Sequence, residues 1–171
     1  MKLESLIAVA GALAEASVRY LIVGGVAVNA HGYQRLTNDL DLVLEMESTN
    51  IRNALAALSA LGYRSMLPVA MEDFADPVVR GRWVDERNLQ VFSLTSDRFP
   101  ETTVDIFATA PFAFDEEYEH ALSEEIDPGV EMRFVRLSTL MQMKAATGRP
   151  RDQDDVQHLR WIQEERADDE A

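Results

Sequence analysis

Two aspartates interrupt one of the most apolar segments of the chain, which runs from Thr37 to Leu44 and contains DLDLVL. Its leucines and valine favour a β-strand, whereas aspartate is among the poorest strand formers, and a buried carboxylate without a partner is unfavourable. Successive side chains of a strand point to opposite faces. We therefore expect Asp39 and Asp41 to share one face, about 6.5–7 Å apart, while the leucines pack into a core on the other face.

A second strand-like run, Thr102 to Phe107, carries one aspartate in the same way. Its apolar residues are expected to face the core, so Asp105 faces the opposite side. If the two strands are neighbours, Asp105 joins Asp39 and Asp41 on one surface. Carboxylates of this kind suit the hard cations Mg²⁺ or Mn²⁺, and three of them can hold two ions for phosphoryl transfer. The alternative interpretation is a set of ordinary solvent-facing acids.

A glycine pair precedes the first of these strands. Tyr20 to Val23 is a short run of β-type residues, Gly24 and Gly25 follow it, and Val26 to His31 is expected to form a short helix. Glycine permits a tight turn and lets backbone N–H groups approach a phosphate, and a helix N-terminus favours an anion. A glycine pair alone is typical of many turns. Its place between a strand, a short helix and a DxD strand is a more specific signal.

The other elements are predicted from hydrophobic periodicity and from capping residues. Helices are expected at residues 3–16, from Ser48 or Thr49 to about Leu61, from Ser138 to Thr147, and from about Asp152 to Glu165. Strands are expected at residues 89–94 and, as an edge strand, at residues 131–135, and a strand or extended segment is expected at residues 63–69. Residues 70–81 indicate a loop or a short helical insert, and residues 111–129 give no assignable pattern.

This order of helices and strands predicts an α+β fold, with helices packed on a mixed β-sheet and a C-terminal helical segment. The length of 171 residues suits one ordinary domain. We expect a single domain over residues 1–171, with a core at about residues 1–110 and C-terminal helices at about residues 137–166.

Charge and composition narrow the class of protein. A net charge of −14 argues against broad, charge-driven binding to nucleic acid or anionic lipid, but leaves a local basic groove possible. The absence of cysteine excludes disulfides, thiolate metal sites and cysteine nucleophiles, and fits a cytoplasmic location. Glu4 interrupts the amphipathic N-terminal segment, which favours a helix over a secretory signal. No apolar run approaches the ~20 residues that span a membrane.

The succession of motifs resembles the nucleotidyltransferase superfamily of the DNA polymerase β type, in which an apolar run, a glycine pair, a short helix and an Asp-x-Asp strand follow one another. Here they appear as IVGG and DLDLVL. Arg35 and Thr37, in GYQRLTNDLD, match a finer pattern of small bacterial nucleotidyltransferases similar to AbiEii-type toxins of abortive-infection and toxin–antitoxin systems. The end of the chain resembles the same group through Lys144, Arg149, Asp152 and Asp155.

The resemblance implies a polymerase-β-like core that binds a nucleoside triphosphate with Mg²⁺ or Mn²⁺. The turn at Gly24 and Gly25 would hold the β- and γ-phosphates. Asp39 and Asp41 would bind both metal ions, and Asp105 would complete the catalytic one. Nucleotide-binding roles are implied for Arg35, Thr37, Lys144 and Arg149 as well. An acceptor hydroxyl would attack the α-phosphate and release pyrophosphate.

Several alternatives stay open. The acceptor would be an RNA such as tRNA, a protein or a small molecule, and Arg80, Arg82 and Arg87 are a candidate basic track for RNA. A second hypothesis is a nucleotide-binding module, or one half of a toxin–antitoxin pair with a cognate partner, on the same fold without turnover. A third is an interaction protein with no nucleotide site.

Several polar and aromatic residues also have plain structural interpretations. Lys144 would suit the surface of an amphipathic helix, and Asp152 and Asp155 would suit a helix start. The histidines show no mutual ligand spacing and are expected at the surface or in packing: His31, His120 and His158. The two tryptophans, Trp83 and Trp161, are expected to pack.

Overall fold

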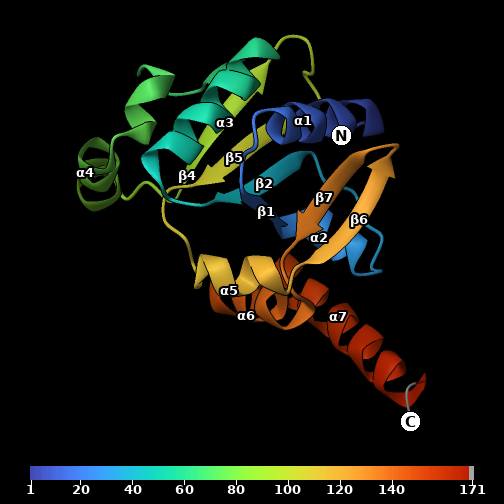
Figure 1. Cartoon of the computed structure of the whole chain (residues 1–171). Helices are drawn as coiled ribbons and strands as arrows, with labels where there is room; N and C mark the ends of the chain where they lie inside the picture. Colours follow the sequence, from blue (N-terminus) through green and yellow to red (C-terminus); the bar gives the residue numbers. More distant parts are fainter. Residues whose placement is uncertain (170–171) are drawn as a thin grey trace.

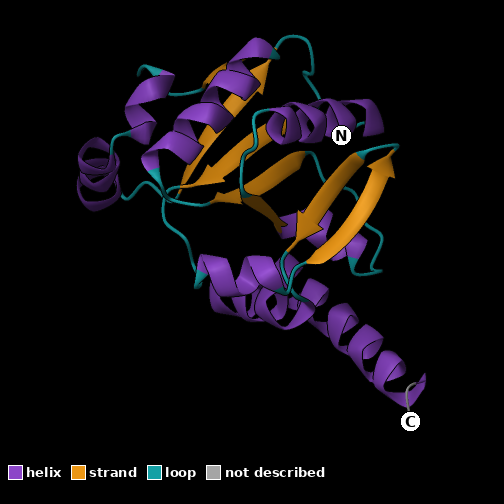
Figure 2. Ribbon diagram, in the orientation of Figure 1, coloured by secondary structure: helices purple, strands orange, loops and turns teal. Residues whose placement is uncertain are grey.

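The chain forms one seven-stranded mixed sheet with helices packed against it (Figure 1, Figure 2). The computed structural model describes residues 1–169, so residues 170 and 171 of the expected domain lie outside the described part. The strands are β1 (Tyr20–Val23), β2 (Asp39–Leu44), β3 (Tyr63–Ser65), β4 (Val91–Ser96), β5 (Thr103–Phe107), β6 (Leu122–Asp127) and β7 (Val130–Phe134). Their order across the sheet is β3-β4-β5-β2-β1-β7-β6. β2 pairs in parallel with β5, and β1 with β7, while the other pairs are antiparallel.

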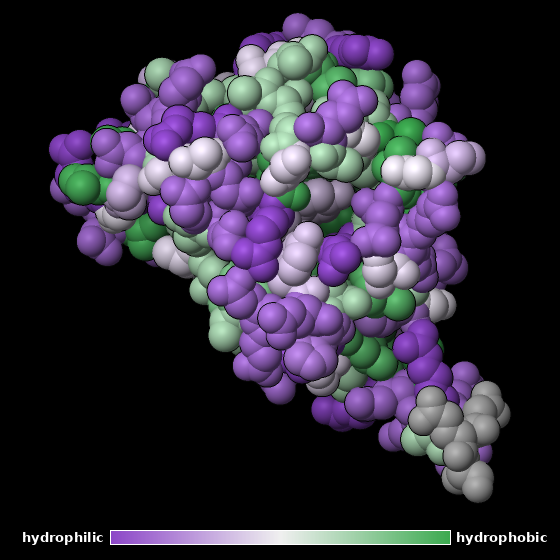
Figure 3. Space-filling model, viewed as in Figure 1, coloured by the Kyte–Doolittle hydropathy of each residue, from purple (hydrophilic) through white to green (hydrophobic). Residues whose placement is uncertain are grey.

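The helices are α1 (Leu3–Glu15), α2 (Gly24–Ala30), α3 (Ser48–Ala60), α4 (Pro77–Arg87), α5 (Phe114–Glu119), α6 (Leu137–Thr147) and α7 (Pro150–Asp169), with a 3-10 helix, η1 (Met71–Ala75), before α4. α1 packs on α3 and β7, and α6 packs on α7 and α2. In Figure 1, α7 projects away from the body of the molecule. Within residues 1–169, no helix combines the length and the hydropathy that crossing a membrane requires. Hydrophilic side chains predominate on the face in Figure 3.

β2 has the two-faced character that its sequence predicts. Leu40, Leu42 and Leu44 are buried, whereas Asp39 is exposed and Asp41 is half-buried. Burying an aliphatic side chain of this size contributes about 1.5–3 kcal/mol. The leucines therefore hold the strand in the core strongly enough for the opposite face to carry acids.

The edge of the sheet differs from the prediction. Residues 130–134 form β7, which lies between β1 and β6 and is not an edge strand. The edge strand on this side of the sheet is β6, and it lies in a segment whose sequence showed no assignable pattern. Its Glu124, Glu125 and Asp127 are exposed acids, which are poor strand formers but suit an unpaired edge because their charge opposes pairing with other chains.

The segment between β3 and β4 holds more helix than expected. Within the strand or extended segment expected at residues 63–69, β3 ends at Ser65, and Pro68 follows without an N–H for a sheet ladder. α4 then continues beyond the short insert predicted at residues 70–81. The Asp76 side chain accepts hydrogen bonds from the backbone N–H groups of Val78 and Val79, and Pro77 occupies the first helical turn. Both features are typical helix-start signals.

Other element boundaries shift by a few residues. α3 is capped by the carboxylate of Glu47, at 2.7 Å from the Thr49 nitrogen and 3.0 Å from the Asn50 nitrogen, and not by Ser48 or Thr49 as expected. α2 starts at Gly24 and α7 at Pro150, each two residues before the predicted start. Proline suits the first turn of a helix because the N–H it lacks has no partner there.

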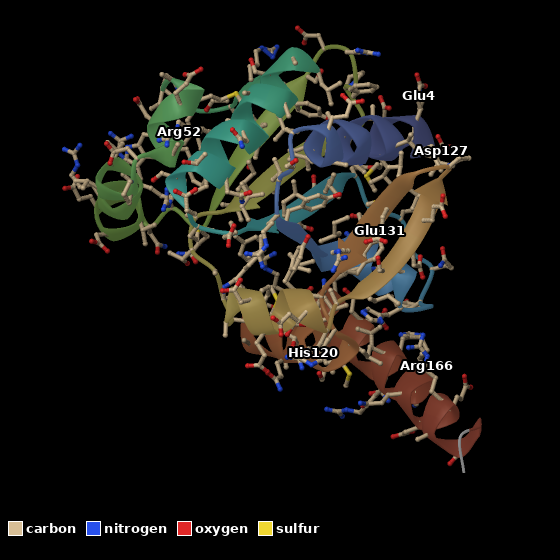
Figure 4. The ribbon with its side chains drawn as sticks, in the orientation of Figure 1. Glu4, Arg52, His120, Asp127, Glu131 and Arg166 are labelled. Carbon is tan, nitrogen blue, oxygen red and sulfur yellow. The ribbon has the colours of Figure 1, made fainter. Side chains whose placement is uncertain are left out.

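The aromatic residues divide between the core and the surface. Trp83 is buried and stacks on Phe92, as expected for packing, whereas Trp161 is 50% exposed. Trp161 lies on α7, where only one side of the helix contacts the protein. Among the histidines, His31 is buried with its Nε2 2.8 Å from the Val135 carbonyl oxygen, and His120 lies at the surface beside α5 (Figure 4).

Candidate active site

Asp39, Asp41 and Asp105 lie on one face of the sheet. β2 and β5 pair in parallel, with Asp41 opposite Asp105 and Asp39 opposite Thr103. Residues that face each other across paired strands project to the same side of the sheet, and so do residues two apart in one strand. The pairing of β2 with β5 therefore brings together three carboxylates from two distant segments of the chain.

The glycine turn lies against these acids. An ideal Cβ on Gly24 would lie 1.8 Å from Oδ2 of Asp41, and the φ of Gly24 is +65°, a value that residues with a side chain rarely adopt. An ideal Cβ on Gly25 would lie 2.6 Å from Oγ1 of Thr37 and 3.1 Å from Nη1 of Arg35. Both glycines are therefore needed for the turn to approach β2 and the loop before it.

The three acids lie in a partly buried, negatively charged site. Burial, together with the nearby Asp105 and Asp39 carboxylates, raises the pKa of Asp41 to about 7, although the Lys144 ammonium acts in the opposite direction. Burial also raises the pKa of Asp105, against the effect of a hydrogen bond from Ser93. Like charges this close resist ionisation unless a cation compensates them.

The acidic site fits a divalent cation. Oδ1 of Asp105 is buried and has no hydrogen-bond partner within the described part of the chain. An oxygen of this kind would gain a partner from a bound ion. Across residues 1–169, no group of three or more histidine, aspartate or glutamate side chains is arranged so that it could hold a metal ion without substrate or rearrangement. Mg²⁺ and Mn²⁺ suit such an open set of oxygens, because they complete their shells with water and substrate phosphate.

Two cationic residues form a buried network with two acids beside the glycine turn. The guanidinium of Arg35 donates from Nε and Nη2 to the two carboxylate oxygens of Asp155, at 2.7 and 2.8 Å. Nζ of Lys144 lies 2.7 Å from Oδ1 of Asp152 and 2.8 Å from Oδ2 of Asp155. The two acids at the start of α7 therefore have a structural role, because they hold the two cations in place.

One cavity of about 580 Å³ is lined by every residue to which the resemblance assigned a metal-binding or nucleotide-binding role. The three aspartates, the two glycines and four further residues line it: Arg35, Thr37, Lys144 and Arg149. They come from β2, β5, the first turn of α2, the loop after α2, and the α6–α7 region. Residues that are distant in the sequence thus meet around one space large enough for a small substrate.

Part of the cavity wall was not predicted. Phe107, Pro111 and Phe112 line it from the connection between β5 and α5, and Thr139 and Met143 line it from α6. The spacing of the α6 residues by four places them on one side of the helix, a signal present in the sequence. The β5–α5 connection has no comparable pattern. Arg151 also lines the cavity, and its guanidinium donates to the Leu36 carbonyl oxygen.

The proposed basic track on α4 does not form as expected. Arg80 is buried, and its Nη1 donates to the Phe74 carbonyl oxygen at 2.7 Å. Burial lowers the pKa of this arginine. Arg82 and Arg87 are exposed, but Asp85 and Glu86 are exposed between them on the same helix. Helical periodicity could have placed Arg80 on the inner face with Trp83, three residues along.

Comparisons with known proteins support this arrangement at the level of the fold. No family model matches the chain, and no curated protein matches it in sequence. Solved structures do match. A crystal structure of ANT(2″)-Ia in complex with adenylyl-2″-tobramycin has a TM-score of 0.54 and 16% identity, over 92% of this chain and 86% of that chain. A solution structure of the antibiotic-resistance factor ANT(2″)-Ia has a TM-score of 0.55 and 17% identity, over 96% and 92%.

A third match is the lincosamide antibiotic adenylyltransferase LnuA with bound lincomycin, at a TM-score of 0.53 and 13% identity over 85% of this chain and 88% of that chain. The chain has the nucleotidyltransferase fold. The expectation of an α+β architecture with helices on a mixed sheet and at the C-terminus is therefore confirmed. The likeness extends over most of the nucleotidyltransferase chains, and at these identities it describes the fold.

Proposed function

We propose that this chain is a nucleotidyltransferase that transfers a nucleotide from a nucleoside triphosphate to an acceptor hydroxyl, with Mg²⁺ or Mn²⁺ as cofactor. One observation carries the proposal: Asp41 lies opposite Asp105 in the sheet and against Gly24 of the turn. The carboxylates that would bind cations therefore lie next to the backbone turn that would contact the phosphates. The nucleotidyltransferase fold supports the same conclusion.

The residues have distinct roles in this proposal. Asp39, Asp41 and Asp105 would hold the divalent cation, which would offset the negative charge of the triphosphate when bound. Asp105 is also the candidate base for the proton of the acceptor hydroxyl, because its Oδ1 is free of hydrogen bonds in the described chain and burial raises its pKa. The hydroxyl oxygen would then form a bond to the α-phosphorus as the bond to the bridging oxygen breaks, and pyrophosphate would leave.

Phosphate contacts would come from the cavity wall. The turn at Gly24 and Gly25 is the candidate for backbone contacts, with the Thr37 hydroxyl beside it. An ammonium group has three N–H donors; Lys144 donates one to Asp152 and forms an ion pair with Asp155, so at least one is left for a phosphate oxygen. Arg149 lines the cavity with an exposed side chain and would supply a further positive charge.

The acceptor would be an RNA, a protein or a small molecule. Two observations weigh against an RNA held by charge: the net charge of −14, and the burial of Arg80. The structural neighbours are described with tobramycin and lincomycin, which favours testing a small hydroxylated molecule first. We propose further that the chain acts as one cytoplasmic domain, related to AbiEii-type enzymes, and that a cognate antitoxin or toxin is a partner to be sought.

The first prediction concerns label transfer. Wild-type protein is incubated with each α-³²P-labelled nucleoside triphosphate, Mg²⁺ or Mn²⁺, and in turn total RNA, cell protein and a panel of hydroxylated antibiotics. We expect label on one acceptor, loss of transfer with a chelator, and a decrease of about 1000-fold in Asp39→Asn/Asp41→Asn. Asp127→Asn, at the far end of β6 (Figure 4), is the matched control and should retain activity.

Other outcomes of this experiment separate the alternatives. Nucleotide binding by calorimetry without transfer to any acceptor would favour the binding module. If the protein neither binds nor transfers a nucleotide, with Mg²⁺ or with Mn²⁺, the result would favour an interaction protein with the same fold. Equal activity in wild type and the Asp39→Asn/Asp41→Asn variant would contradict the assigned site.

A further inference from the structure

The loop between α2 and β2 is contacted by residues of α7 from Arg151 to Arg166. The loop, residues 31–38, has no helix or strand of its own. The contacts from α7 involve Arg151 with the Leu36 carbonyl, Asp155 with Arg35, Asp154 with the Tyr33 hydroxyl, His158 stacked on the Tyr33 ring, and Arg166 with the His31 carbonyl. Arg166 is labelled on α7 in Figure 4. The order of this loop therefore depends on a helix that follows it by more than a hundred residues.

Asp155 is the most buried member of this interface. Its side chain has 0% exposure, and it is shared by two cations from two different elements. Arg35 of the loop occupies both carboxylate oxygens, and Lys144 of α6 lies 2.8 Å from Oδ2. The bidentate pair fixes the position of Arg35, and loss of the Asp155 charge would leave the Arg35 guanidinium without its carboxylate partner, whereas Lys144 would keep Asp152.

Three of the five N–H donors of Arg35 are committed within the protein. Nε and Nη2 bind Asp155, and Nη1 donates to the Leu36 carbonyl oxygen at 3.2 Å. Nη1 also lies within 3.1 Å of the position that a Cβ on Gly25 would take. Arg35 therefore packs against the glycine turn with its charge compensated. The bidentate pair with a fully buried carboxylate holds the guanidinium in place and offsets its charge, so the geometry is that of a supporting residue beside the glycine turn.

We infer that Asp155 is a positioning residue of the candidate site. It acts through Arg35 and Lys144, and it sets the distance between the turn at Gly24-Gly25, the loop that leads into β2, and the lysine on α6. The inference gives Arg35 a different role from the phosphate contact that the sequence pattern suggested. Its catalytic consequence rests on the proposed function, whereas its structural consequence, the order of residues 31–38, does not.

The experiment compares Asp155→Asn and Arg35→Lys with a matched control, Glu164→Gln, which changes a carboxylate to an amide on an exposed part of the same helix. Hydrogen–deuterium exchange of residues 31–38 is measured well below the melting temperature of each variant. Asp155→Asn should exchange at least about tenfold faster than wild type in this loop, and Arg35→Lys should be intermediate because a lysine keeps the charge but not the bidentate geometry.

Kinetics provide the second measurement. In Asp155→Asn we expect kcat to fall about 100-fold with KM changed by no more than about threefold, because misplacement of the reacting groups affects chemistry more than binding. Arg35→Lys should lose about tenfold in kcat, and Glu164→Gln should match wild type. A residue with only a structural role would lower the melting temperature without moving kcat or loop exchange at lower temperature.

Each result decides something. If both variants fold and neither loop exchange nor kcat differs from Glu164→Gln, the positioning role is overturned. If Asp155→Asn does not fold, Arg35→Lys carries the same test. If the wild type neither binds nor transfers nucleotides, the proposed function fails, and the exchange of residues 31–38 still decides whether Asp155 orders the loop.

Discussion

A hydrogen atom in place of a side chain lets the turn at Gly24 touch Asp41. With φ at +65° and an ideal Cβ at 1.8 Å from the Asp41 carboxylate, any side chain at this position would displace either the turn or the acid. Gly11, in contrast, lies within α1 with open space around its ideal Cβ. The two glycines therefore differ in function although they are chemically identical.

Gly24→Ala is expected to lower nucleotide transfer at least about 100-fold, because it moves a reacting group by roughly 1 Å or more. It should also lower the free energy of unfolding by about 1–3 kcal/mol through backbone strain. Gly11→Ala is the control, and should raise the free energy of unfolding by about 0.5–1 kcal/mol because alanine is the better helix former. Urea denaturation and initial rates measure both effects. A Gly24→Ala enzyme with normal rates would show that the turn is not held against Asp41.

The sequence predicts some residues of the site and not others for a physical reason. Asp39, Asp41 and Asp105 could be placed on one face because strand alternation is a local rule. Arg35 and Asp155 are separated by 120 positions, and no periodic rule relates a loop residue to a distant helix. The pairing of Asp155 with Arg35 and Lys144 therefore required the structure.

At the scale of elements, α6 depends on its neighbour α5. The start of α6 has no side-chain cap of its own. The Glu117 carboxylate of α5 accepts from the backbone N–H of Arg136 at 2.6 Å, from the guanidinium of Arg136, and from the Thr139 hydroxyl at 2.9 Å. Because α6 carries Lys144 and part of the cavity wall, this buried acid connects α5 to the candidate site.

Glu117→Gln should lower the free energy of unfolding by about 2–3 kcal/mol at pH 7, since hydrogen bonds to a charged group are lost. Burial acts to raise the pKa of Glu117, but the bonds from Arg136 and Thr139 outweigh it and the pKa is lowered. A depressed folded-state pKa gives stability that is present above the unfolded pKa of about 4.3 and is lost as the pH falls through the folded value.

The difference in stability between wild type and Glu117→Gln should therefore be constant from pH 7 to about pH 5 and should shrink below about pH 4. Denaturant titrations at several pH values measure it. Glu116→Gln, an exposed acid in the same helix, is the control, with an expected change within about 0.5 kcal/mol. A difference that grows as the pH falls would contradict the assigned hydrogen bonds.

Elements with strong local signals were predictable, and those without were not. α1, β1 and β2 follow clear periods and appear within a few residues of the expected positions. β6 is composed largely of acids that are poor strand formers, so its place in the sheet comes from pairing with β7. Only a loop or a short helical insert was expected at residues 70–81, and the full extent of α4 was not predicted although Asp76 and Pro77 mark its start, because its apolar spacing is weak.

For the molecule as a whole, the net charge of −14 restricts how any RNA acceptor can bind. With Arg80 buried, the candidate basic track on α4 loses one of its three arginines for phosphate contacts. We expect any binding to tRNA, measured by filter retention, to fall at least about tenfold between 50 and 200 mM salt and to strengthen with Mg²⁺. Poly-glutamate, an anion of the same sign without bases, is the control competitor. Retention that does not depend on salt would exclude an RNA held through its phosphates.

α7 extends outward from the body of the molecule (Figure 1), while its inner side contacts residues 31–36. The outer end of α7 can therefore affect the geometry of the candidate pocket from a distance. A macromolecule that bent or pulled this end of the helix would loosen the loop beside the glycines without competing with a substrate for space.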